Sequence, residues 1–117
     1  MWQTASGVKV YLALGFTDMR KSINGLSIMV EHHLAQDPFS GHLFAFCNRR
    51  RTILKVLYWD RSGFCLWHKR LDKDKFHWPK GEEEVQEITS RQLQWLIDGL
   101  SLQQPQAYKP RRYQSVF

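Results

Sequence analysis

The side chains that could carry chemistry in this chain are mostly cations, and they gather in its middle. Residues 47–80 hold ten lysines and arginines against three aspartates, a net charge of +7 where the whole chain carries +6. Tyrosine and tryptophan side chains lie among these cations, at Tyr58, Trp59, Trp67 and Trp78. Positive charge interleaved with aromatic rings is typical of a surface that binds a polyanion. We therefore predict nucleic-acid contacts at nine of the cations: Arg49, Arg50, Arg51, Lys55, Arg61, Lys69, Arg70, Lys73 and Lys75.

A simpler interpretation of the same charge competes with this prediction. Lysines and arginines on a surface keep a protein soluble whether or not it binds an anion. Two features favour nucleic acid: the sequence pI is about 9.6, and the cations are concentrated rather than spread. Guanidinium groups match phosphate geometry, and aromatic faces can stack on bases. Sequence-specific readout is not expected, because no recognition-helix motif is visible.

An enzyme needs reactive groups that converge, and this sequence does not predict such a group. Asp37 and Asp60 lie in turns whose geometry already accounts for an aspartate, and the glutamates after Gly81 cluster in an exposed stretch. Neither arrangement favours metal-dependent DNA cleavage. Cys65 and His68 are three apart on a predicted strand and would point to opposite faces, which disfavours a metal site. We expect no catalysis, no bound metal and no cofactor.

The elements that must position the cations are short strands between residues 37 and 78. A run of turn formers, Asp37-Pro38-Phe39-Ser40-Gly41, precedes them. Apolar runs at 43–47, 53–59, 64–71 and 76–78 alternate with polar breaks, and Pro79 stops the last run. The break Asp60-Arg61-Ser62-Gly63 has the aspartate and glycine of a type I turn. This pattern predicts an antiparallel β-meander whose connections and strand ends carry the charge.

Two helices and one further strand complete the expected fold. Residues 8–14 alternate imperfectly and predict a strand that pairs with the edge of the meander. A helix to about residue 35 is predicted from its apolar spacing, with Thr17 as N-cap and Asp18 in its first turn. A second helix is predicted to begin at a capping box formed by Thr89 and Gln92 and to end at Gly99. The glutamate-rich residues between these helices and after Pro79 are expected to form a polar linker.

Length and composition indicate one small α+β domain. The expected fold is an antiparallel meander of four or five strands packed with two helices over residues 1–102, followed by a flexible basic tail at 103–117. No apolar run approaches the ~20 residues that cross a bilayer, and the first residues lack a signal-peptide pattern. We therefore expect a cytoplasmic protein without membrane contact. Cys47 and Cys65 are expected to be buried thiols on the first and third meander strands.

Four motifs occur in order along the chain: Thr17-Asp18-Met19-Arg20-Lys21, Asp37-Pro38-Phe39-Ser40-Gly41-His42-Leu43-Phe44, Leu57-Tyr58-Trp59-Asp60-Arg61-Ser62-Gly63-Phe64-Cys65-Leu66-Trp67 and Phe76-His77-Trp78-Pro79. Together they resemble the accessory protein encoded by the second open reading frame of insertion sequence 66 elements, often called TnpB. The resemblance implies a small bacterial protein encoded in a transposable element, beside a larger transposase that carries the acidic catalytic residues. The residues that carry it are Asp18, Arg20, Lys21, Asp37, Pro38, Phe39, Gly41, Trp59, Asp60, Gly63, Trp67, Trp78 and Pro79.

Two functions remain open at this point. The first is a non-catalytic accessory factor in transposition that binds DNA or RNA with low sequence specificity, the co-encoded transposase, or both. In this interpretation Arg20 and Lys21 belong to a phosphate- or partner-binding surface; the alternative for them is solvated cations beside an aspartate that favours the helix dipole. The second function is a protein-interaction module in which Trp59, Trp67 and Trp78 form an interface and the charge only aids solubility.

Overall fold

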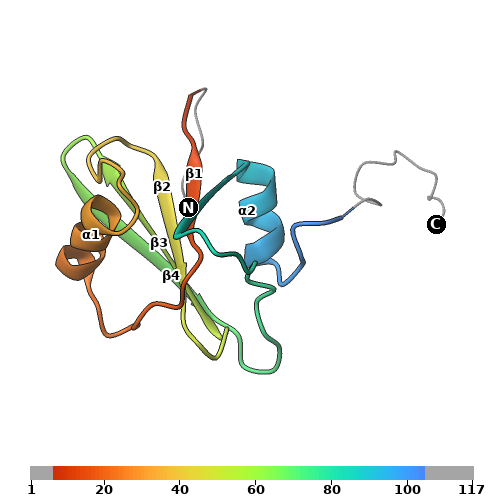
Figure 1. Cartoon of the computed structure of the whole chain (residues 1–117). Coiled ribbons are helices and arrows are strands. Elements are labelled where there is room, and N and C mark those ends of the chain that lie inside the picture. The colour runs from red at the N-terminus through yellow and green to blue at the C-terminus, as the bar shows by residue number, and fades with distance from the viewer. Residues whose placement is uncertain (1–6, 105–117) are drawn as a thin grey trace.

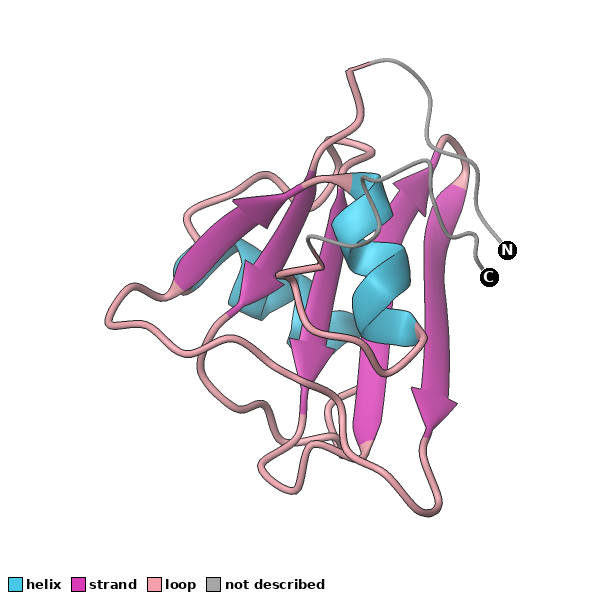
Figure 2. Cartoon of the chain, turned by 90° about the vertical axis from the view of Figure 1, so that its right-hand side faces the viewer, coloured by secondary structure: helices cyan, strands magenta, loops and turns pink. Residues whose placement is uncertain are grey.

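A five-stranded sheet carries one helix on each face (Figures 1 and 2). The strands are β1 (Val10–Ala13), β2 (Leu43–Cys47), β3 (Ile53–Asp60), β4 (Gly63–Arg70) and β5 (Val85–Ile88), and the helices are α1 (Ile23–His32) and α2 (Ser90–Ile97). The computed structural model describes residues 7–104. Nearly all of the predicted basic tail therefore lies outside the described residues.

The strand order across the sheet is β4-β3-β2-β1-β5. Strands β2, β3 and β4 are antiparallel neighbours, which confirms the predicted meander. Strand β1 pairs with the meander edge at β2, as predicted, but runs parallel to it, and β5 is antiparallel to β1. A parallel pair needs a long crossover, and the connection that contains α1 supplies it. The fold class is α+β, as expected, with a mixed sheet whose pairs are mostly antiparallel.

The two faces of the sheet have separate apolar cores. On the α2 face, Leu43, Ala45 and Cys47 of β2 pack in one cluster with Leu93 and Leu96. On the other face, the alternate residues Phe44 and Phe46 pack in a cluster with Leu26 and Val30 of α1. Because successive strand residues point to opposite faces and both faces are covered, all five residues of β2 are buried. This double burial explains why β2 is a continuous apolar run.

The first helix begins later than predicted. Its N-cap is Ser22, and its first backbone bond runs from the Leu26 N–H to the Ser22 carbonyl. Thr17 is not a cap, because its hydroxyl accepts no hydrogen bond from a backbone N–H. Its own N–H donates to the Cys47 carbonyl at 2.8 Å, which ties this residue to the end of β2. Asp18 therefore lies outside the helix, and the predicted interaction with the helix dipole was wrong.

Two assignments after β4 were also wrong. Residues 76–78 form no strand; instead Phe76 and Trp78 are buried in the core on the α2 face. The Trp78 indole N–H donates to the Ala13 carbonyl at 2.9 Å, which satisfies its polar atom inside that core. Residues predicted as a polar linker include β5, which pairs with all four residues of β1.

The ends of α2 match the prediction. The Thr89 hydroxyl accepts from the Gln92 N–H at 3.1 Å, and the Gln92 side chain accepts from the Thr89 N–H at 2.9 Å, which together form a capping box. At the other end, Gly99 has φ of 84°, and its N–H and that of Leu100 donate to carbonyls of the last turn. These two hydrogen bonds, together with a glycine in the left-handed conformation, form a Schellman motif.

The β3–β4 turn and the cysteines differ in part from the prediction. Arg61 has φ of 49°, whereas both central residues of a type I turn have negative φ, so the predicted turn type was wrong. Cys47 and Cys65 are free thiols on β2 and β4, with β3 between them as predicted. Cys47 is buried, and desolvation raises the pKa of its thiol to about 12. Cys65 is only partly buried.

Candidate nucleic-acid interface

The turn that joins β2 to β3 presents three consecutive arginines at one end of the sheet. Asn48 organises this turn, because its side-chain oxygen accepts from the N–H groups of Thr52 and Ile53 at 2.9 and 3.0 Å. Its own carbonyl accepts from the Arg51 N–H at 3.0 Å, and Arg51 takes a left-handed φ of 61°. Arg49 and Arg50, at the tip, are exposed. The turn is thus a defined scaffold for its guanidinium groups.

A second cationic segment is bonded to the same turn. Arg70 ends β4 opposite Ile53, and the next N–H, of Leu71, donates to the Thr52 carbonyl at 2.8 Å. The Phe76 N–H donates to the Arg51 carbonyl at 2.7 Å, so both ends of the 71–76 segment are fastened to the turn. The turn and this segment lie at the lower end of the sheet in Figure 1. The exposed Lys73 and Lys75 therefore belong to the same end as the arginines.

The β1–α1 loop supplies the remaining cations at this end. Arg20 lines a shallow depression together with Arg49 and Arg50. Its guanidinium forms an ion pair with Asp18 at 2.7 Å, and this hydrogen-bonded pair lowers the pKa of the Asp18 carboxyl to about 2. We define the basic end as Arg20, Lys21, Arg49, Arg50, Arg51, Arg70, Lys73 and Lys75. The carboxylates among these eight cations are Asp18, Asp72 and Asp74.

Two predicted contact residues take structural positions instead. The Lys55 ammonium donates to the Met19 carbonyl at 2.9 Å and to the Lys21 carbonyl at 3.3 Å, which fastens the β1–α1 loop to β3. The Lys69 ammonium, on the α2 face, donates to the Ile97 carbonyl at 2.9 Å. Both ammonium groups point along the sheet faces towards backbone carbonyls. Neither is presented to solvent in the way that the cations of the basic end are.

Arg61 is exposed at the opposite end of the sheet. It sits in the β3–β4 turn, one eight-residue strand away from the 48–52 turn. At about 3.3 Å per residue, this strand separates the two turns by roughly 25 Å. Arg61 therefore does not contribute to the surface that the arginines of the basic end form.

The tryptophans do not share one surface. Trp78 is 4% exposed and belongs to the core, while the partly buried Trp67 packs on that same α2 face. Trp59 lies on the other face and meets Phe39 and Phe64 with ring centroids 5.1 and 5.0 Å away. The three tryptophans therefore cannot form one interface, as the protein-interaction hypothesis had assumed. Sequence reasoning missed the Phe39 cluster, because the two motifs that form it are separated by β2 and most of β3.

No metal-binding group stands out in residues 7–104, where no three side chains of histidine, cysteine, aspartate or glutamate converge. Cys65 and His68 lie on opposite faces of β4, as the alternation of a strand requires. Within the same described range, no helix is long and apolar enough to cross a membrane.

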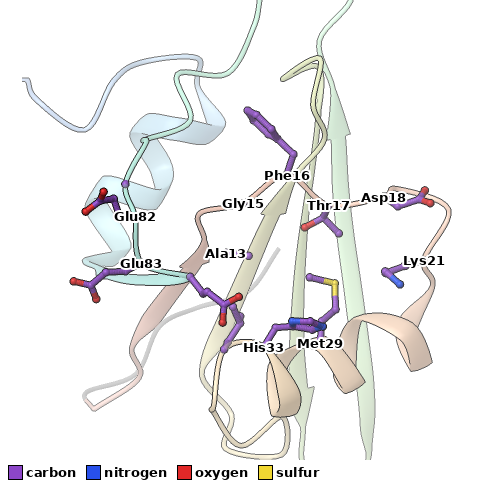
Figure 3. A pocket seen from close by; sticks show the side chains of 13 residues that line it. Ala13, Gly15, Phe16, Thr17, Asp18, Lys21, Met29, His33, Glu82 and Glu83 are labelled. Atoms are coloured by element: carbon purple, nitrogen blue, oxygen red, sulfur yellow. The ribbon is translucent and has the colours of Figure 1, made fainter.

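A groove of about 570 Å³ opens between the β1–α1 loop, α1 and the segment before β5 (Figure 3). Thr17, Met29 and His33 line one wall, and residues 81–84 line the other, across the floor at Ala13. Sequence reasoning did not find this groove. Its walls come from residues 17–33 and 81–84, which are distant in the chain and meet because β5 pairs with β1.

Comparison with known proteins shows which family the chain belongs to. Uncharacterized protein y4hO of Sinorhizobium fredii (strain NBRC 101917 / NGR234) is 38% identical to it over 106 residues, which cover 91% of this chain and 92% of that protein. Uncharacterized protein y4jC of the same strain is 32% identical over 94 residues, 80% of each chain. No solved structure matches the chain. The family described as IS66 Orf2 like protein matches residues 8–107, which confirms the resemblance drawn from the four motifs: the chain belongs to this family.

Proposed function

We propose that this protein is a non-catalytic accessory factor of transposition that holds nucleic acid on its basic end. Family membership supports the accessory role in transposition. The observation that supports nucleic acid is the convergence of eight cations from three separate segments on one end of the sheet, against three carboxylates. Because two of these carboxylates, Asp18 and Asp72, pair with Arg20 and Arg70, the other cations remain available for phosphates.

The geometry supports backbone binding rather than base reading. Neither helix takes part in the basic end, and its cations stand on turns and loops except for Arg70, the last residue of β4. Exposed cations on loops can neutralise phosphates, whereas a major-groove reader presents a helix or a paired strand to base edges. We therefore expect weak, sequence-tolerant binding that depends strongly on salt.

The test is the salt dependence of binding to a fluorescein-labelled DNA duplex, measured by anisotropy. If about six phosphates are neutralised, the logarithm of affinity falls against the logarithm of salt with a slope of roughly −5. The triple variant R50Q/K73Q/K75Q removes three exposed cations of the basic end and should flatten that slope by about 3 units. Single-stranded RNA of the same length, run in parallel, shows which nucleic acid is preferred.

A matched control removes the same charge elsewhere. The variant K9Q/R61Q/R91Q neutralises three exposed cations outside the basic end and should keep most of the slope. Equal losses in the two triple variants would show that net charge, not the basic end, drives binding. Unchanged affinity in R50Q/K73Q/K75Q at every salt concentration would remove the basic end from the proposal.

A second candidate function is a protein-interaction module, and the Phe39 cluster favours it. Phe39 is 58% exposed although its ring packs on the partly buried Trp59 and Phe64, so an aromatic side chain faces solvent at the end of the sheet opposite the basic end. Aromatic residues of this kind anchor protein interfaces. In a pull-down, the F39S variant should not retain the co-encoded transposase. The wild-type protein should retain it even after nuclease treatment. Loss of the partner on nuclease treatment alone would mean that nucleic acid bridges the two proteins.

A further inference from the structure

The groove beside α1 differs in charge from the rest of this basic protein, because its lining holds the carboxylates of Asp18, Glu82, Glu83 and Glu84 against one lysine, Lys21. One of its walls carries Glu82, Glu83 and Glu84, all exposed, and none of them forms an ion pair within the described residues. Figure 3 shows the Glu82 and Glu83 side chains extending outward at the rim. Three adjacent carboxylates repel one another, and a cation between or beside them relieves that repulsion.

The opposite wall holds a polar atom without a partner. Thr17 is 5% exposed, and its hydroxyl oxygen has no hydrogen bond although it is sealed from water. Figure 3 shows this oxygen on the side of the threonine that faces Ala13 and the glutamate wall. A buried hydroxyl without a partner destabilises the fold, and a donor that enters the groove would remove that cost. Met29, which also lines this wall, is unbranched and can repack to admit it.

We propose that this groove binds an arginine side chain of a partner protein. The guanidinium group has five N–H donors on two edges, so it can donate to the Thr17 hydroxyl on one wall and to glutamate carboxylates on the other. Its aliphatic stem would lie over Ala13 and Leu34 on the floor and wall of the groove.

A neighbouring contact shows that this region accepts guanidinium. The Phe16 ring lines the groove, is 43% exposed, and has the guanidinium carbon of Arg49 over it at 5.7 Å from the ring centroid. Planar guanidinium stacks on aromatic faces more readily than an ammonium group does. The groove is therefore assigned to arginine rather than lysine.

The test uses a fluorescein-labelled peptide with two arginines among glycines and serines, and measures its anisotropy with the full-length protein. A protein with a net charge of +6 repels such a peptide in general, so binding requires a local acidic site. The variant E82Q/E83Q/E84Q should weaken binding more than tenfold, about what the loss of charged hydrogen bonds produces. The control E31Q/D72N/D74N removes three carboxylates outside the groove and should bind as wild type does. A citrulline peptide, which has the same shape without the charge, should not bind.

Thr17→Val separates a ligand role from a structural one. Without peptide, this variant should melt at a higher temperature than wild type, because the unpartnered hydroxyl is gone. With peptide, it should bind about tenfold more weakly, because one acceptor is lost. Wild-type affinity in Thr17→Val, equal losses in the two triple variants, or equal binding of a lysine peptide would each overturn the proposal. The groove variants keep every cation of the basic end, so this result is independent of the nucleic-acid test.

Discussion

The ammonium group of Lys69 on β4 donates a hydrogen bond to the carbonyl oxygen of Ile97, the last residue of α2, at 2.9 Å. The final carbonyls of a helix have no partner within the helix, and they carry the negative end of its dipole. Lys69 therefore supplies both a donor and a favourable charge where α2 meets the sheet. This cation holds the fold together, although the sequence grouped it with the phosphate-binding candidates.

Replacing Lys69 by methionine should lower stability more than nucleic-acid affinity. The substitution keeps most of the packed stem and removes the donor, so we expect a loss of about 1 to 2 kcal/mol in the free energy of unfolding. Lys73→Met, on the exposed basic end, is the matched control and should unfold as wild type does while weakening DNA binding. Urea melts and duplex anisotropy measure the two effects. If Lys73→Met lost more stability than Lys69→Met, and Lys69→Met lost more DNA affinity than Lys73→Met, the structural role of Lys69 would be contradicted.

Arg61→Gly should stabilise the protein. Arg61 holds φ of 49°, a left-handed conformation that costs an L-residue about 1 to 2 kcal/mol and glycine almost nothing. Part of this gain is lost because glycine has more freedom in the unfolded chain, which leaves an expected gain of about 0.5 to 1 kcal/mol. Arg61→Ala removes the same charge but keeps the strained φ, so it should give no gain. Equal stability of the glycine and alanine variants in urea would show that this φ carries no strain.

The meander was predictable from sequence because its signals are local. The strands β2, β3 and β4 are apolar runs separated by short polar breaks, and each strand pairs with the next along the chain. The capping box of α2 spans only four residues, Thr89 to Gln92. In each case the residues that fix the structure are close neighbours in the sequence.

The elements that were missed depend on distant partners. Strand β5 contains Gln86 and Glu87 and reads as polar, but β1 pairs with it from more than 70 residues earlier in the chain. The helix α1 starts after Ser22 rather than after Thr17, and the Thr17 N–H bonds to the carbonyl of Cys47, 30 residues later in the chain. Propensity alone does not reveal such tertiary bonds.

The positive charge of the candidate site was predictable from the sequence, but the residues that form the site were not. Composition located the cations, but strand register decides that Lys55 and Lys69 reach backbone carbonyls on opposite faces. The same register sets Arg61 at the far end of the β3–β4 hairpin. The groove had no signal in the sequence, since its glutamates and Thr17 meet only through the pairing of β1 with β5.

Two substitutions in α2 should have unequal costs. Thr89→Ala removes the hydroxyl that caps the Gln92 N–H, which should lower the free energy of unfolding by about 1 kcal/mol. Leu96→Ala opens a cavity at a fully buried position between α2 and the sheet, for an expected loss of roughly 2 to 5 kcal/mol. Gln94→Ala, at an exposed position of the same helix, is the control for helix propensity. Small and equal losses for Thr89→Ala and Leu96→Ala in urea melts would mean that α2 is not docked in solution.

Arg20 should control the titration of Asp18. The Arg20 guanidinium hydrogen-bonds both oxygens of the Asp18 carboxylate at 2.7 to 3.1 Å, which lowers the pKa of that carboxyl from 3.8 to about 2. A depressed pKa in the folded protein means that the pair contributes stability above pH 3.8 and loses it as the pH falls from there towards 2. Because the pair is exposed, this contribution is small and salt should reduce it. In Arg20→Gln, carbon NMR of the Asp18 carboxyl should show its pKa returning towards 3.8, while Arg50→Gln, at the same end of the sheet, should leave it low. A low pKa that persists in Arg20→Gln would assign the shift to the loop backbone rather than to the guanidinium.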